Sequence, residues 1–101
     1  MSDATTTRPK DKITEKLKEP EECRVILLND DYTTMDFVME ILMALFHKSP
    51  EEANAIMLEV HEKGKGIAGQ YIWDIAITKV EQVHLIAREH QFPLRCIVEP
   101  C

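Results

Sequence analysis

The chain has 101 residues, of which 45% are apolar and 30% charged, a balance typical of one small soluble globular domain. Its formal net charge is −6, which argues against a nucleic-acid partner because phosphate binding relies on clustered Lys and Arg. No apolar stretch approaches the roughly 18 residues that a membrane-spanning helix needs, so no membrane partner is expected.

Residues 1–22 have a different composition from the remainder. They contain two large aliphatic residues, Ile13 and Leu17, among Thr, Lys, Glu and two prolines. Such a segment cannot bury enough apolar surface to fold alone, so we predict a flexible N-terminal extension over 1–22 and one core domain over 23–101.

The cysteines Cys23, Cys96 and Cys101 are odd in number, match no zinc-site spacing and follow no secretory signal. We therefore expect reduced thiols in a cytoplasmic protein. With two acidic residues among the first eleven, the N-terminus is a poor organelle transit peptide, so a bacterial cytoplasm is favoured over a plant organelle.

A short buried strand is predicted over Arg24–Leu28, where four aliphatic residues follow one another. Thr33 is the expected N-cap of a helix that runs to about His47 with an i, i+3, i+4 apolar stripe. A second helix is expected from the N-cap Ser49 to about Gly64. That helix carries Ala53, Ile56, Met57, Val60 and His61.

Residues 64–72 form a glycine-containing, irregular strand in this interpretation, with a bulge or a close backbone approach. A third helix is predicted over 73–91, and a last strand over 94–98 after Pro93. The inward positions of that helix are Ile75, Val80, Val83, Ile86 and Ala87. The order β-α-α-β-α-β predicts a small α+β domain in which three helices pack on a three-stranded antiparallel sheet.

Asn29, Asp30 and Asp31 end the first strand and form the densest polar cluster. A calcium loop would place ligands at Asn29, Asp31, Thr33 and Glu40, but Thr34 stands where that loop needs Gly. A paired-carboxylate hydrolase would need a second acidic group that the sequence does not mark. Turn and capping chemistry is the remaining structural explanation.

His61 follows Val60 on the second helix and shares a face with Met57. A single His beside apolar residues is most often a core or boundary residue, and the segment HEKGK does not match the HExxH zinc motif. The sequence gives no support for a nucleophilic pair of Cys23 with a histidine. Neutral and anionic acceptors beside a His and methionines would, however, suit a primary ammonium group attached to a bulky apolar side chain.

The segments VILLNDDYTTMDFV, AIMLEVHEKGKGIAG, TKV and FPLRC resemble the ClpS family of N-degron adaptor proteins, over about Arg24 to Glu99. The resemblance implies the same β-α-α-β-α-β domain and no catalysis. It implies an adaptor that binds proteins with N-terminal Leu, Phe, Tyr or Trp. These are delivered to the AAA+ unfoldase ClpA for degradation by the ClpP peptidase, and the adaptor thereby modulates the unfoldase's choice of substrates.

Residue roles follow from the same resemblance. The substrate's α-amino group would be bound by Asn29, Asp30, Asp31 and His61. The side-chain pocket would be lined by Leu28, Thr33, Met35, Val38, Met57, Val60 and Leu94, with Met35 as a gatekeeper against β-branched residues. Asp74 and Lys79 would contact the N-terminal domain of the unfoldase, which would also engage the extension during delivery.

Two other functions make different demands on this sequence. An interaction domain of the same fold, like the C-terminal domain of a ribosomal stalk protein, would dock through its helices and would not require Asn29, Asp30 and His61 together. A small hydrolase would need a nucleophile and base that the sequence lacks. The resulting prediction is a monomeric adaptor with no catalytic residue, metal or cofactor.

Overall fold

The computed structural model describes residues 21–100 of the chain. Its elements are β1 (Cys23–Leu28), α2 (Met35–Phe46), α3 (Pro50–Lys63), β2 (Lys65–Tyr71), α4 (Trp73–Glu89) and β3 (Arg95–Glu99). This order confirms the predicted β-α-α-β-α-β domain. The expected extension, apart from Glu21 and Glu22, and Cys101 lie outside the described residues.

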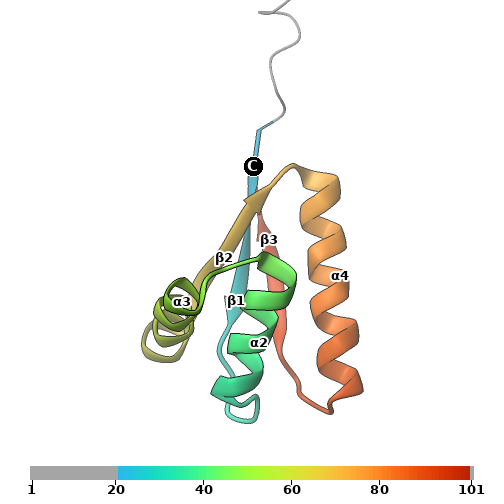
Figure 1. Ribbon diagram of the computed structural model, residues 1–101. Coiled ribbons are helices and arrows are strands. Elements are labelled where there is room, and N and C mark those ends of the chain that lie inside the picture. Colours follow the sequence, from blue (N-terminus) through green and yellow to red (C-terminus); the bar gives the residue numbers. More distant parts are fainter. Residues whose placement is uncertain (1–20, 101) are drawn as a thin grey trace, which may run out of the picture.

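The three strands form one antiparallel sheet in the order β2-β1-β3, so the first strand lies at its centre. Helices α2 and α4 lie over one face of this sheet, and α3 lies beside β2 at its edge (Figure 1). The register of β1 with β2 shifts between Val25 and Ile26, which confirms the bulge expected in the glycine-containing strand.

The core lies between the sheet and the helices. On β1, Cys23, Val25 and Leu27 are fully buried because alternate residues of a strand point to the same face. The helices contribute the buried residues Phe37, Val38, Ile41, Leu42, Phe46, Ala53, Met57, Val60, Ala76, Val83 and Ala87. Ile75, predicted to point inward, is instead 46% exposed, and Ala76 occupies that inward position.

The second helix begins as its sequence predicts. Ser49 and Glu52 form a reciprocal capping box, in which the Ser49 hydroxyl accepts from Glu52 N at 3.1 Å and the Glu52 carboxylate accepts from Ser49 N at 2.9 Å. The helix ends at Gly64, whose φ of 88° lies in the left-handed region that glycine adopts without strain.

Close packing at Gly66 fixes α3 against the sheet. A Cβ atom at this position would lie 2.9 Å from Val60 Cγ2 and 3.3 Å from the carbonyl oxygen of Ile56. Only a residue without a side chain therefore lets β2 approach α3 this closely.

The expectation of reduced cysteines is wrong for Cys23, which is disulfide-bonded, whereas Cys96 is a free, buried thiol. The sheet register gives the physical setting. Because Arg24 lies opposite Glu99, the end of β3 comes beside the start of β1. Spacing along the sequence, which separates these segments widely, does not reveal this proximity.

Candidate functional site

The site is built where β1 ends and α2 begins. Asn29 N donates to the carbonyl oxygen of Gly64 at 2.9 Å, which joins the end of β1 to the end of α3. Asn29 and His61 therefore come from segments far apart in sequence that meet at this point. The chain then turns through Asp30–Thr33 into α2.

The carboxylate of Asp30 organises the turn. Its Oδ1 accepts from Tyr32 N at 2.8 Å and from Thr33 N at 2.7 Å, and its Oδ2 accepts from the Thr33 hydroxyl at 2.7 Å. The predicted N-cap role of Thr33 is therefore wrong, because Asp30 engages both its backbone and its side chain. Thr34 caps α2 instead, accepting from Phe37 N at 3.1 Å.

Asp30 is held in its charged form. Partial burial acts to raise its pKa, but the hydrogen bonds from Thr33 and Tyr32, together with the positive charge of Arg88, keep the pKa below its ordinary value of 3.8. A carboxylate has about four lone-pair positions, so three internal hydrogen bonds leave capacity for a further cationic donor.

Nine of the eleven residues predicted to bind the substrate line a single cavity of about 240 Å³. These are Asn29, Asp30, Asp31, Thr33, Met35, Val38, Met57, Val60 and His61. We call the four polar groups Asn29, Asp30, Asp31 and His61 the polar rim. The other five, which are four hydrophobic residues and Thr33, we call the apolar wall. The cavity is smaller than the roughly 300–1,000 Å³ typical of drug-sized ligands, so it suits one side chain rather than a large cofactor.

Leu28 and Leu94 lie outside this cavity. Leu28 lines a neighbouring cavity of about 370 Å³ with Pro93 and Arg95, which shares Asn29, Asp30 and Asp31 with the first. Leu94 is only 1% exposed and belongs to the core. The alternation of β1 explains the place of Leu28, which shares its face with Ile26 rather than with Leu27.

The two residues predicted to contact an unfoldase lie on α4 in different environments. Asp74 is exposed in the first turn. Lys79 is half-buried, and its Nζ donates to the carbonyl oxygen of Leu45 at 2.6 Å and lies 6.0 Å and 5.6 Å from the Phe46 and Tyr71 ring centroids. Lys79 therefore also has a structural role, because its hydrogen bond to Leu45 joins the end of α2 to α4.

Sequence reasoning missed Arg88, a residue of α4 that acts on the site through its charge and its hydrogen bonds. Its Nη1 donates to the carbonyl oxygens of Phe92 at 2.8 Å and Leu94 at 3.0 Å, and its charge acts on Asp30. A basic residue in the last turn of a helix often binds free carbonyls, and that position was the signal available in the sequence.

The described residues contain neither a metal-binding cluster nor a membrane-spanning helix. Between residues 21 and 100, no group of three or more His, Cys, Asp or Glu side chains is arranged to hold a metal ion. Across the same residues, none of the helices combines the length and hydrophobicity needed to cross a membrane.

Comparisons with known proteins agree with one another. A family model described as "ATP-dependent Clp protease adaptor protein ClpS" matches residues 18–97. A ClpS adapter from Syntrophus aciditrophicus is 55% identical over 85 residues, covering 84% of this chain and 79% of the relative. One from Acetivibrio thermocellus is 49% identical over 100 residues, covering 99% of both chains.

A solved structure, Agrobacterium tumefaciens ClpS2 bound to L-phenylalaninamide, is similar to the chain with a TM-score of 0.78. It is 35% identical and covers 82% of this chain and 100% of its own.

Proposed function

The chain belongs to the ClpS family of adaptors for the ATP-dependent Clp protease, and on that basis we propose that it selects substrates by their N-terminal residue. Like the members of this family and the similar proteins named above, it is an adaptor and not an enzyme. The proposed ligand is a free α-amino group on a bulky hydrophobic residue, namely Leu, Phe, Tyr or Trp.

One observation carries this proposal: a polar rim and an apolar wall share one small cavity. An α-amino group is largely protonated at neutral pH and has three N–H donors. Asn29, the Asp30 carboxylate and His61 can each accept a hydrogen bond from it. The apolar wall receives the side chain, whose burial contributes about 1.5–3 kcal/mol. L-phenylalaninamide, the ligand in the solved structure of the similar protein, has both features, an amine and an aromatic side chain.

Neither part of the cavity suffices alone. A charge-assisted hydrogen bond contributes about 1.5–3 kcal/mol, which is of the same order as the burial of one side chain. Association costs at least about 4 kcal/mol of lost translational and rotational freedom. Useful affinity therefore requires the amine and the bulky side chain together.

Fluorescence anisotropy with labelled peptides tests the proposal. Four peptides are needed, identical except for their first residue: Leu, Phe, Ile and N-acetyl-Leu. We expect binding of the Leu and Phe peptides only, because acetylation removes the charge and two donors and the β-branched Ile meets Met35. Equal binding of free and acetylated Leu peptides would disprove recognition of the N-terminus.

Delivery forms the second part of the proposal. The adaptor, acting as a monomer in the bacterial cytoplasm, would bring the substrate to a ClpA-type unfoldase through Asp74 and Lys79, with residues 1–22 engaged during transfer. Because Lys79 also holds α2 and α4 together, Asp74 is the better residue for a test of this contact.

We expect Asp74→Lys to slow degradation of a Leu-starting reporter by ClpA and ClpP while leaving peptide affinity unchanged. Unchanged degradation would place the contact elsewhere.

A further inference from the structure

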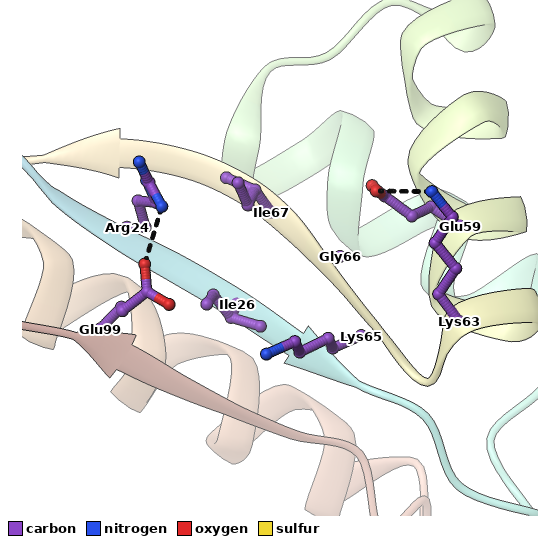
Figure 2. Close-up of a pocket in the computed structure, with 8 residues that line it drawn as sticks. All are labelled: Arg24, Ile26, Glu59, Lys63, Lys65, Gly66, Ile67 and Glu99. Atoms are coloured by element: carbon purple, nitrogen blue, oxygen red, sulfur yellow. Dashed lines mark hydrogen bonds and ion pairs between the residues drawn. The ribbon is translucent and has the colours of Figure 1, made fainter.

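The face of the sheet opposite α2 and α4 carries a second organised surface. Its central residues are Arg24, Ile26 and Leu28 of β1, which alternate with the fully buried Val25 and Leu27. Figure 2 shows the strands of this face in front and helices behind them. We call the surface the open face and define it by Arg24, Ile26, Leu28, Lys65, Ile67, Arg95, Ile97 and Glu99.

The sheet register arranges the open face in rows. Ile26 lies between Ile67 on β2 and Ile97 on β3, which makes an apolar row across all three strands. Ile67 and Ile97 are each 41% exposed, while Ile26 is only 4% exposed although no helix covers it. The flanking side chains therefore shield the centre of the row, and its outer residues are exposed to solvent.

The next row is cationic. Leu28 lies between Lys65 and Arg95, both exposed. Among the residues that the structure describes, neither forms an ion pair, although Arg95 borders a cavity that also contains Asp30 and Asp31. Figure 2 shows the Lys65 side chain lying beside Ile26, with no ion pair drawn from it to the other labelled residues.

At the other end of the open face, where β1 begins, the charges form an ion pair. Arg24 Nη1 lies 3.0 Å from Glu99 Oε1, and at the side of the face Lys63 Nζ lies 4.0 Å from Glu59 Oε2. These residues line a cavity of about 280 Å³ together with Ile26, Lys65, Gly66 and Ile67 (Figure 2). Lys65 and Arg95, which form no ion pair within residues 21–100, thus lie beside the apolar row, on a chain whose net charge is −6.

We propose that the open face docks an acidic, amphipathic segment of a partner protein. Its carboxylates would pair with Lys65 and Arg95, and its branched or aromatic side chains would cover Ile26, Ile67 and Ile97. Charge complementarity selects this occupant, because a cationic or uncharged apolar segment leaves the two cations unpaired. No residue of the open face lines the substrate cavity, although Leu28 and Arg95 border the neighbouring cavity that shares Asn29, Asp30 and Asp31 with it.

Methyl NMR of the full-length protein with an acetylated 12-residue peptide of alternating Leu and Glu tests the proposal. Acetylation prevents recognition of the peptide's N-terminus by the substrate cavity. We expect shifts at Ile26, Ile67 and Ile97 and none at the buried Ile41. Neutralising both cations, in Lys65→Gln with Arg95→Gln, should weaken binding roughly fivefold, the combined effect of two exposed ion pairs.

Matched variants separate this docking from general effects. Lys48→Gln removes a charge away from the open face and should leave the peptide affinity unchanged. Ile97→Ser should abolish binding, whereas Leu85→Ser, on the exposed surface of α4, should not. A Leu-starting peptide should bind every variant as it binds the parent, which keeps this test separate from that of the substrate cavity.

Several outcomes would overturn the proposal. Equal binding of a peptide with Gln in place of Glu would remove the role of charge. Equivalent shifts with a short DNA duplex would identify a nucleic-acid surface instead. Shifts of the three Ile methyls on dilution, or on deletion of residues 1–20, would show that a second copy or the chain's own N-terminus covers the face.

Discussion

Asp30 combines two tasks in the proposed site, because it shapes the turn and carries the charge that faces the ligand. Its three hydrogen bonds to Tyr32 and Thr33 belong to the first task. Asp31, its exposed neighbour, accepts no such bond within residues 21–100 and offers only charge. A comparison of the two residues therefore separates local structure and direct contact from long-range attraction.

Asp30→Asn is expected to weaken binding of a Leu-starting peptide about 10- to 100-fold. The Asn side-chain oxygen can still accept from the turn amides, so the loop is kept, but the charge-assisted bond to the amine is lost. Asp31→Asn, the matched control, should change the affinity less. Anisotropy titrations measure both effects, and equal losses in the two variants would show that only the total negative charge matters.

Met35 is the residue whose size should decide selectivity. It is the first residue of α2, lines the cavity and is 44% exposed, so its truncation should cost little stability. We expect Met35→Ala to admit Ile- and Val-starting peptides while retaining Leu. Leu58→Ala on α3, a truncation of a residue exposed to a similar extent that does not line the cavity, should leave selectivity unchanged. Continued exclusion of Ile by Met35→Ala would argue against the gatekeeper role.

At the scale of elements, the glycines at the α3–β2 connection position half of the cavity. Met57, Val60 and His61 lie on α3, whose distance from the sheet is set by the contact of Gly66 with Val60 and Ile56. Gly64, two residues earlier, has an unusual backbone conformation but no atom within 4 Å of an added Cβ. The two glycines thus have different physical roles.

Gly66→Ala should lower the free energy of unfolding by about 1–3 kcal/mol, as overpacking does, and should also weaken peptide binding because α3 must move. Gly64→Ala should cost about 1 kcal/mol through backbone strain and leave the affinity nearly unchanged. Urea unfolding and anisotropy on both variants measure the two quantities. A Gly66→Ala protein with full affinity would show that the cavity does not depend on this contact.

The same elements show how far sequence alone reaches. The order of strands and helices, the Ser49 cap and the Gly64 end follow from local patterns, and all are confirmed. The N-cap is Thr34 instead of the predicted Thr33, because the local hydrogen bonds from Thr33 to Asp30, rather than helix propensity, decide which of two adjacent threonines caps α2.

Nonlocal packing decides the remaining differences. The hydrophobicity of Ile75 predicts an inward position, but Ile75 is exposed. The smaller Ala76 is the buried residue at this point of α4. For the candidate site, periodicity and composition marked the polar cluster, whereas joining it to His61 required the resemblance to a family. The bond from Asn29 to Gly64 that brings these segments together has no signature in sequence.

At the scale of the whole molecule, groups with displaced pKa values define the pH range of greatest stability. Burial lowers the pKa of His84, with repulsion from Arg88 and Arg95 adding to it, while burial raises the pKa of Tyr71 and raises that of Cys96 to about 12. At low pH, Asp30 has its pKa held down by its hydrogen bonds in spite of burial. We therefore expect stability to be greatest between about pH 6.5 and pH 9.

As the pH falls below this range, His84 is the first of these groups whose protonation lowers the free energy of unfolding. Its neutral Nε2 accepts from Cys96 N at 3.1 Å, which connects α4 to β3. Because the folded pKa lies below the ordinary 6.5, the unfolded chain binds more protons as the pH falls, and the contribution of His84 is present above 6.5 and lost below it. Asp30 acts only at lower pH, since its contribution is present above 3.8.

Urea unfolding at pH 7.5 and pH 5.5 should therefore show a lower free energy of unfolding at pH 5.5 for the parent chain. His84→Gln keeps an acceptor for Cys96 N but cannot titrate, so its stability should change much less between the two values. Asp30→Asn removes a carboxylate that stays ionised at both pH values and should retain the parent's difference. If His84→Gln also retains it, other groups must link α4 and β3 to pH, and the neutral His84 ring would have only a packing role.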